Sequence, residues 1–241
     1  MNKIRMISLL LALTIISSAL VFPASAAAHK EVSGAIEANE EQMRELNAER
    51  KEGKENRSEK ETLASAVTDV RGATWIYTSR NFYYYSQEYS YSCGAACVRM
   101  ALRNITGTNY SEKTIRDGCN ASNSAVFIGN MKKYINKMQN HNAYVPRVGV
   151  DKSTMQSNLY SGIANWDSPP IIGVEENMRD GWYFDLPGHF ITVYAARSDK
   201  EKFLIADPWA GYVNEPGKNW RNVSVTELYN AYSSTVIGYI F

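Results

Sequence analysis

The sequence lacks several features that would each point to a class of protein. Its 241 residues carry a formal net charge of only +1, so no basic excess favours nucleic acid and no acidic excess favours a solvating tail. Beyond the N-terminus, no stretch offers about 18 consecutive apolar residues, so no stable membrane span is expected in the mature protein. Internal repeats are absent too. With 44% hydrophobic residues, the chain suffices for one domain of ordinary size plus extra segments.

The first residues predict export. Lys3 and Arg5 precede the apolar run MISLLLALTIISSALV, and small residues then lead to Ala26. A basic start, an apolar middle and a small-x-small close are typical of a secretory signal peptide. The alternative is an uncleaved anchor, but the run is slightly short for a membrane span. We therefore expect residues 1–26 to be removed and the protein to be secreted or associated with the cell surface.

A charged segment follows the predicted signal peptide. Residues 27–66 are rich in Glu, Lys, Arg and Asn and have little apolar area to bury. Two interpretations stay open. The segment is either a flexible or loosely helical spacer, or a pro-segment that covers an active site and inhibits it until removed. From about residue 67 Tyr and Trp become frequent, and residues 67–241 are expected to form the folded domain.

Within this domain, helix signals come first and strand signals second. Gly107 and Gly118 stand where helices are expected to end, and Ser111 is placed to cap the second helix. The helices are predicted over 93–104, 111–118, 124–140 and 153–165, and the strands over 169–176, 189–197, 201–208 and 234–241. This order predicts an α+β fold in which a helical lobe packs against a mostly antiparallel sheet.

Cys93 stands where a nucleophilic cysteine is expected. It begins the predicted helix 93–104, where backbone N–H groups and the helix dipole favour an anionic sulfur. The small side chains of Gly94, Ala95 and Ala96 are expected to leave room for a substrate chain. A buried core cysteine is the ordinary alternative. The position at a helix start, without bulky neighbours, favours the nucleophile.

Of the three histidines, His189 has the most suggestive surroundings. His29 lies in the charged segment and His141 in a predicted loop, whereas His189 follows Gly188 and begins a strand. Asp207 closes the next strand, so a strand, a turn and a return strand would bring its carboxylate beside the ring. There it would fix the tautomer and stabilise the imidazolium. Taken singly, each residue also has an ordinary explanation, as a core histidine and as a turn aspartate before proline.

Gln87 and the remaining cysteines complete the set of candidates. Gln87 lies six residues before Cys93, and its side-chain amide is expected to join the Cys93 backbone N–H in binding a substrate oxygen. A surface glutamine is the alternative. Because three is an odd number of cysteines, at least one thiol cannot pair within the chain. Cys97 is assigned to packing or to a disulfide with Cys119.

Two further groups of residues lie near His189 in the sequence. Trp182, Tyr183 and Phe184 are expected to pack in the core, with a role in lining a peptide cleft as the alternative. Glu175 and Glu176 end a predicted strand. They are expected at a solvated strand end, and contact with basic substrate residues is the alternative.

The candidates occur in an order that resembles a known family. The patterns Q-x5-C-G-x-A-C, G-H-F and A-D-P are similar to those of papain-like cysteine peptidases, most of all the bacteriocin-leader-processing (double-glycine) peptidase domain. The resemblance covers roughly residues 80–241 and implies a papain-like two-lobed fold without a cofactor or a metal. It also implies Cys93 as nucleophile and His189 as general base and acid. By the same resemblance, Asp207 orients the histidine and Gln87 donates to the oxyanion.

Domains of this kind are often fused to export ATPases, but this sequence contains no G-x-x-x-x-G-K-[ST] motif. We therefore expect a free-standing exported relative that hydrolyses peptides or proteins through an acyl-enzyme. Two alternatives are an acyltransferase or transpeptidase with the same triad, and a non-catalytic secreted binding module on the same scaffold. A zinc site formed by Cys93, Cys97 and His189 is disfavoured, because C-x3-C is an unusual zinc spacing and no second cysteine pair follows.

Overall fold

The computed structural model describes residues 72–121, 123–140, 144–233, 235 and 237–241. The predicted signal peptide (1–26) and charged segment (27–66) lie outside the described residues, and both remain predictions. Within the described part of the chain, no helix combines the length and the apolar character needed to cross a membrane.

Helices and strands alternate irregularly along the domain. The helices are α3 (Cys93–Thr106), α4 (Glu112–Gly118), α5 (Ile128–Gln139), α6 (Lys152–Ala164), α7 (Pro208–Tyr212) and α8 (Val225–Ser233), with 3-10 turns at Met178–Asp180 and Pro216–Lys218. The strands are β1 (Trp75–Tyr77), β2 (Pro146–Arg147), β3 (Ile171–Glu176), β4 (Leu186–Arg197), β5 (Lys202–Ala206), β6 (Trp220–Ser224) and β7 (Tyr239–Ile240). The seven strands form one sheet in the order β2-β7-β3-β4-β5-β6, with β1 also paired to β4, and the pairings are antiparallel.

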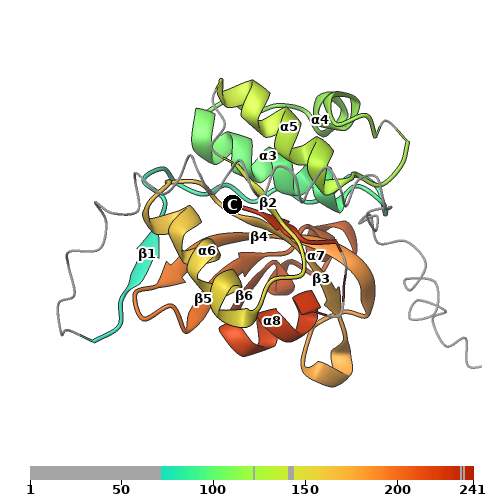
Figure 1. The fold of residues 1–241 in the computed structure, drawn as a ribbon. Helices are drawn as coiled ribbons and strands as arrows, with labels where there is room; N and C mark the ends of the chain where they lie inside the picture. The colour runs from blue at the N-terminus through green and yellow to red at the C-terminus, as the bar shows by residue number, and fades with distance from the viewer. Residues whose placement is uncertain (1–71, 122, 141–143, 234, 236) are drawn as a thin grey trace, which may run out of the picture.

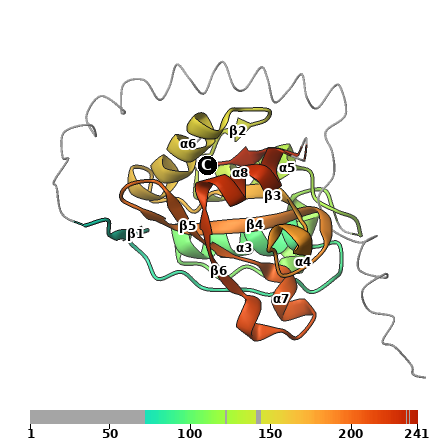
Figure 2. The same ribbon diagram turned by 90° about the horizontal axis from the view of Figure 1, so that it is seen from below.

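Helices cover both faces of this sheet (Figures 1 and 2). Side chains alternate along β4, so Phe190 packs with the residues of α3, α4 and α5, while Ile191 and Val193 pack with those of α6 and α8. The predicted α+β fold, with a helical lobe against an antiparallel sheet, is confirmed. The structure adds a second helical layer on the opposite face, whose α8 was not predicted.

The capping residues recognised in the sequence predicted several helix ends correctly. Gly107 adopts a left-handed conformation with φ of 73° at the end of α3, and the Ser111 side chain accepts a hydrogen bond from the Thr114 N–H at the start of α4. The third helix begins at Ile128 rather than at residue 124, because Val126 forms a β-bridge and Phe127, the N-cap residue, has an extended backbone.

The small residues after Cys93 have a different role from the one expected. Gly94, Ala95 and Ala96 are buried, and a Cβ atom on Gly94 would lie 3.1 Å from the sulfur of Met131 and 3.2 Å from a ring carbon of Phe190. The expectation that these residues leave room for a substrate is therefore wrong. Their small size instead lets α3 pack closely against α5 and β4.

Candidate active site

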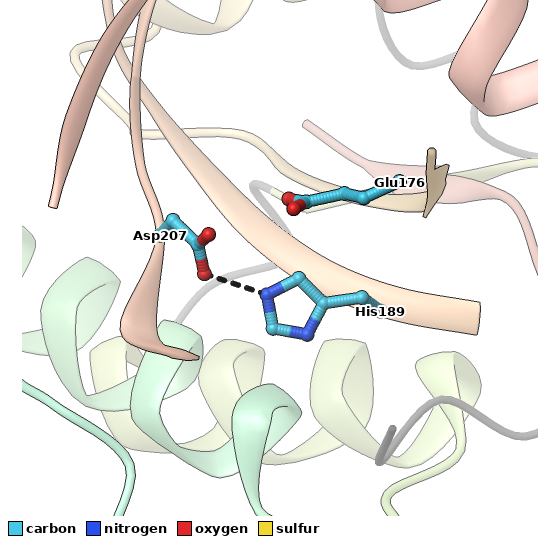
Figure 3. Close-up of side chains that lie close together, drawn as sticks. All are labelled: Glu176, His189 and Asp207. Atoms are coloured by element: carbon cyan, nitrogen blue, oxygen red, sulfur yellow. Dashed lines mark hydrogen bonds and ion pairs between the residues drawn. The ribbon is translucent and has the colours of Figure 1, made fainter. Parts of the chain in front are cut away.

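The centre of the site is a buried pair formed by His189 and Asp207. The β4–β5 hairpin pairs Thr192 with Ala206, so Asp207, the next residue, reaches the ring from the adjacent strand. His189 Nε2 and Asp207 Oδ1 lie 2.7 Å apart (Figure 3), and the two residues are 0% and 4% exposed. The strand–turn–strand spacing in the sequence predicts this proximity.

Asp207 also caps the short helix that follows it. Its Oδ1 accepts the backbone N–H of Trp209 at 2.9 Å, and Pro208 occupies the first position of α7. The Tyr84 hydroxyl donates to the Asp207 carbonyl at 2.9 Å and accepts the Gly211 N–H at 3.0 Å. These contacts hold the carboxylate in one orientation toward the imidazole.

A β-bulge sets the position of His189 on its strand. Val174 pairs with His189 and Glu176 pairs with Leu186. The paired positions are therefore three residues apart on β4 but only two apart on β3, which places one extra residue in β4. Gly188, immediately before His189, has φ of 67°, in the left-handed region that favours glycine. Bulges of this kind redirect a side chain at the end of a sheet. The glycine in the G-H-F pattern therefore has a conformational role.

Cys93 is the first residue of α3 and is 1% exposed. The Ser92 side chain makes no capping hydrogen bond to α3, and the first turn of α3 contains no acidic residue. Among the described residues, Nδ1 of His189 has no hydrogen-bond partner, and Figure 3 shows it turned away from Asp207. The ring thus offers one nitrogen to the carboxylate, and its other nitrogen is available to a further group.

The charges around the imidazole favour its protonated form. Burial alone would lower the pKa of His189, but the negative charge of Asp207 and the interaction with Cys93 outweigh it and raise this pKa well above its usual value. An imidazolium beside a helix N-terminus is the environment in which a cysteine sulfur is stabilised as an anion. The arrangement can therefore support a thiolate–imidazolium pair.

Gln87 is buried, so the alternative of a surface glutamine is wrong. Its Nε2 donates to the Tyr89 carbonyl at 2.7 Å, and its backbone N–H donates to the Pro208 carbonyl at 3.2 Å. The second contact fixes Gln87 beside the loop that carries Asp207. Its role toward an oxyanion stays a prediction, because its amide is hydrogen-bonded within its own loop.

Cys97 and Cys119 are buried free thiols in this structure. Cys97 Sγ lies 3.3 Å from the Phe190 carbonyl oxygen, and burial raises its pKa well above the usual value. Burial also raises the pKa of Cys119 to about 12. The assignment of Cys97 to packing agrees with these contacts, and both thiols are held in the unreactive neutral form.

Glu176 is a member of the site that the sequence interpretation missed. It is 3% exposed and its carboxyl group points toward the His189–Asp207 pair (Figure 3), so the expectation of a solvated strand end is wrong for this residue. No clear signal was present in the sequence, because residues 171–174 are all buried and the strand shows no alternation leading to Glu176.

The nearest donor atoms of Glu176, His189 and Asp207 lie within 4.8 Å of one another, a separation that a metal ion could bridge. Nε2 of His189 and Oδ1 of Asp207 are hydrogen-bonded to each other, and we assign no metal to this group.

The aromatic residues before β4 serve mainly in packing, as expected. Trp182 and Phe184 are 6% and 9% exposed, while Tyr183 is 38% exposed.

A hollow of about 260 Å³ lies beside Trp182 and α8, and none of the four predicted site residues lines it.

Comparison with known proteins supports the motif resemblance. The profile of the Peptidase C39 family matches residues 81–238. No curated protein matches the chain. Similar solved structures include the peptidase domain of Streptococcus ComA, a bi-functional ABC transporter involved in a quorum-sensing pathway, with 18% identity and a TM-score of 0.42 over 66% of this chain and 97% of that one.

Two other solved structures are similar at a comparable level. A double glycine motif protease from an AMS/PCAT transporter, in complex with its leader peptide, has 15% identity and a TM-score of 0.44 over 69% of this chain and 95% of that one. The proform of the ragweed pollen cysteine protease Amb a 11 has 12% identity and a TM-score of 0.42 over 74% of this chain and 67% of that one. The family match confirms the resemblance drawn from the sequence motifs.

Proposed function

The chain belongs to the Peptidase C39 family and is a cysteine-type peptidase, and from this premise we propose that Cys93, His189 and Asp207 are its catalytic triad. The observation that carries the proposal is the buried 2.7 Å hydrogen bond between His189 Nε2 and Asp207 Oδ1. It leaves Nδ1 of the ring for the sulfur at the start of α3. A nucleophile, a base and a group that orients the base are the parts that covalent catalysis requires.

In the proposed reaction, the Cys93 thiolate attacks the carbonyl carbon of a peptide bond. As the tetrahedral intermediate collapses, His189 gives its proton to the leaving amine, and the acyl group remains on the sulfur as a thioester. Neutral His189 then takes a proton from a water molecule, which attacks the thioester and releases the acid. Asp207 stabilises the imidazolium and fixes the orientation of the ring throughout.

The developing oxyanion needs hydrogen-bond donors that are in place before the reaction. We assign this role to the Cys93 backbone N–H and to the Gln87 amide. An amide carries two N–H donors, and the Tyr89 carbonyl accepts from the Gln87 nitrogen at 2.7 Å. The second N–H is the one that we assign to the substrate.

A peptide-mixture experiment tests the proposed function. The untreated enzyme is expected to cleave peptides in the mixture, as read by mass spectrometry. Treatment with iodoacetamide should abolish cleavage and place a carbamidomethyl group on Cys93 alone, with release of iodide, because Cys97 and Cys119 are held as neutral buried thiols. Treatment with EDTA should have no effect. Cleavage that survives complete alkylation of Cys93 would contradict the triad.

The alkylation rate also reports how the site opens. Cys93 is 1% exposed, so a peptide can reach its sulfur only after neighbouring atoms move aside. A bound peptide should therefore slow alkylation by occupying the opened site.

The reaction products distinguish acyl transfer from hydrolysis. Transfer would join the acyl part of the peptide to an added amine, whereas hydrolysis would leave it as the free acid.

We also propose that the peptidase acts outside the cytoplasm, since residues 1–26 have the pattern of a signal peptide. Expression in a bacterial host should release a form whose first residue is Ala27. N-terminal sequencing of the extracellular or cell-surface fraction measures this directly. A protein that keeps Met1 and stays in the cytoplasmic fraction would contradict export, with no bearing on the triad.

A further inference from the structure

Glu176 is a buried acid beside the proposed triad for which the reaction above has no role. It is 3% exposed, and neither of its carboxyl oxygens has a hydrogen-bond partner among the described residues. Its nearest oxygen and the nearest donor atoms of His189 and Asp207 lie within 4.8 Å of one another. A buried, ionised carboxylate without donors would be very costly, so this geometry itself calls for an explanation.

The sheet directs Glu176 toward His189. Val174 is paired with His189 across β3 and β4, and Glu176 lies two residues after Val174 on the same side of the strand. Figure 3 shows its side chain reaching the pair from the opposite direction to Asp207. The imidazole is thus flanked by two carboxyl groups, one from β3 and one from the residue that follows β5.

The groups that face Glu176 come from four elements. His189 on β4 and Arg221 on β6 favour its ionised form, whereas Asp207 after β5 and Cys93 on α3 disfavour it. The charge of Arg221 is shared, because its guanidinium lies 3.3 Å from the Glu227 carboxylate and donates to the Gly181 carbonyl at 2.6 Å. No cation is therefore dedicated to Glu176.

The two carboxyl groups differ in their donors. Asp207 Oδ1 accepts from both the His189 ring and the Trp209 N–H, which stabilises its negative charge. Glu176 accepts from neither. Ionising two carboxyl groups this close together in a buried site costs much free energy, so one of them keeps its proton. The proton stays on Glu176, because no hydrogen-bond donor in the described part of the chain stabilises its negative charge. In agreement, burial, with the charge of Asp207 adding to it, raises the pKa of Glu176 well above its ordinary value.

We propose that Glu176 is a positioning residue that keeps its proton while Cys93 and His189 form their ion pair, and that acts through His189 to set the alkaline limit of that pair. The inference rests on the proposed triad. A neutral Glu176 leaves Asp207 as the single carboxylate beside the ring. When Glu176 ionises at alkaline pH, its new charge holds the imidazolium proton more tightly and delays the loss of the ion pair.

Stability measurements test the buried proton without reference to catalysis. An unfolded glutamate loses its proton near its ordinary pKa of 4.5, whereas folded Glu176 keeps it, so folding takes up a proton above that pH. The wild-type unfolding constant, relative to that of Glu176→Gln, should therefore rise by up to about tenfold per pH unit as the pH increases from 4.5 toward the raised pKa. Urea unfolding across a pH series gives this ratio.

Glu175→Gln is the matched control, because Glu175 is the preceding residue of β3 and is not part of the cluster around His189. Its unfolding constant should follow that of the wild type at each pH. A ratio for Glu176→Gln that stays flat with pH would overturn the proposal. If Glu176→Gln does not fold, infrared spectra of the wild type at neutral pH decide the question: the carbonyl band of a protonated carboxylic acid supports the proposal, and its absence overturns it.

The pH profile of kcat/KM for peptide cleavage tests the action through His189, because an imidazole that has lost its proton cannot protonate the leaving amine. Glu176→Gln should keep the acid limb of the wild-type profile, while its alkaline limb should move to lower pH by about one unit or more, since the stabilising charge cannot form. A profile that superimposes on that of the wild type would overturn the positioning role. Absence of peptide cleavage by the wild type would contradict the proposed triad. Cleavage by the wild type together with a pH-independent ratio of the wild-type and Glu176→Gln unfolding constants would contradict only the proposal for Glu176.

Discussion

Cys93→Ala is expected to lower kcat/KM for peptide cleavage by a factor on the order of 10⁴ to 10⁶, because the acyl-enzyme cannot form without the sulfur. The substitution removes one atom from a buried position and leaves the His189–Asp207 hydrogen bond in place. The fold should therefore survive. Initial rates with a peptide identified in the mixture experiment, combined with a circular dichroism spectrum of the variant, measure both effects.

Cys97→Ala provides the control for this substitution. Cys97 lies one turn further along α3, is as buried as Cys93, and makes its sulfur contact with the Phe190 carbonyl rather than with the imidazole. We expect it to lose stability by about 1 kcal/mol and to keep the wild-type kcat/KM within a few-fold. Equal losses of activity in the two variants would indicate that packing of α3, and not nucleophilic chemistry, explains the effect at Cys93.

Asp207→Asn is expected to lower kcat by about 10² to 10⁴, since the neutral amide no longer stabilises the imidazolium or fixes its tautomer. Asp207 raises the pKa of His189 against the effect of burial, so its removal should lower that pKa. The imidazolium is lost as pH rises through this pKa. The alkaline limb of the pH–rate profile should therefore move to lower pH, which rates measured across a pH series will show.

Comparison with Asp207→Ala separates catalysis from helix capping. Asn is a good N-cap residue, so Asp207→Asn should keep the hydrogen bond from the Trp209 N–H, whereas Asp207→Ala loses it. The alanine variant should be less stable by about 1 kcal/mol while losing a similar share of kcat. If the asparagine variant keeps the wild-type kcat, the negative charge of Asp207 is not needed, and its proposed role in stabilising the imidazolium is wrong.

The parts of the site that sequence alone could predict depend on short-range patterns. A helix start at Cys93 and a stop at Gly107 follow from local conformational preferences, and the structure has α3 over Cys93–Thr106. The proximity of His189 and Asp207 follows from a single hairpin, in which one strand, one turn and one return strand fix the spacing. Interactions of this kind need no knowledge of the rest of the fold.

The parts that could not be predicted depend on contacts between distant segments. β1 and β2 contain three and two residues, too few for an alternating pattern to be recognised, and β6 is a largely exposed strand at the end of the sheet. The burial of Gly94 depends on α5 and β4 together, which local sequence does not specify. Glu176 was missed because β3 is buried on both faces, so its sequence does not alternate, and a carboxyl group at the strand end suggested solvent.

The hydroxyl group of Tyr84 links two stretches of chain that lie far apart in sequence. One oxygen atom binds the Asp207 carbonyl and the Gly211 N–H, while its ring packs against Trp220 with centroids 5.4 Å apart. The segment before α3 is thereby tethered to the loop that carries Asp207. The hydrogen bond from the Gln87 N–H to the Pro208 carbonyl joins the same two stretches, so the position of Asp207 is coupled to that of the segment before α3.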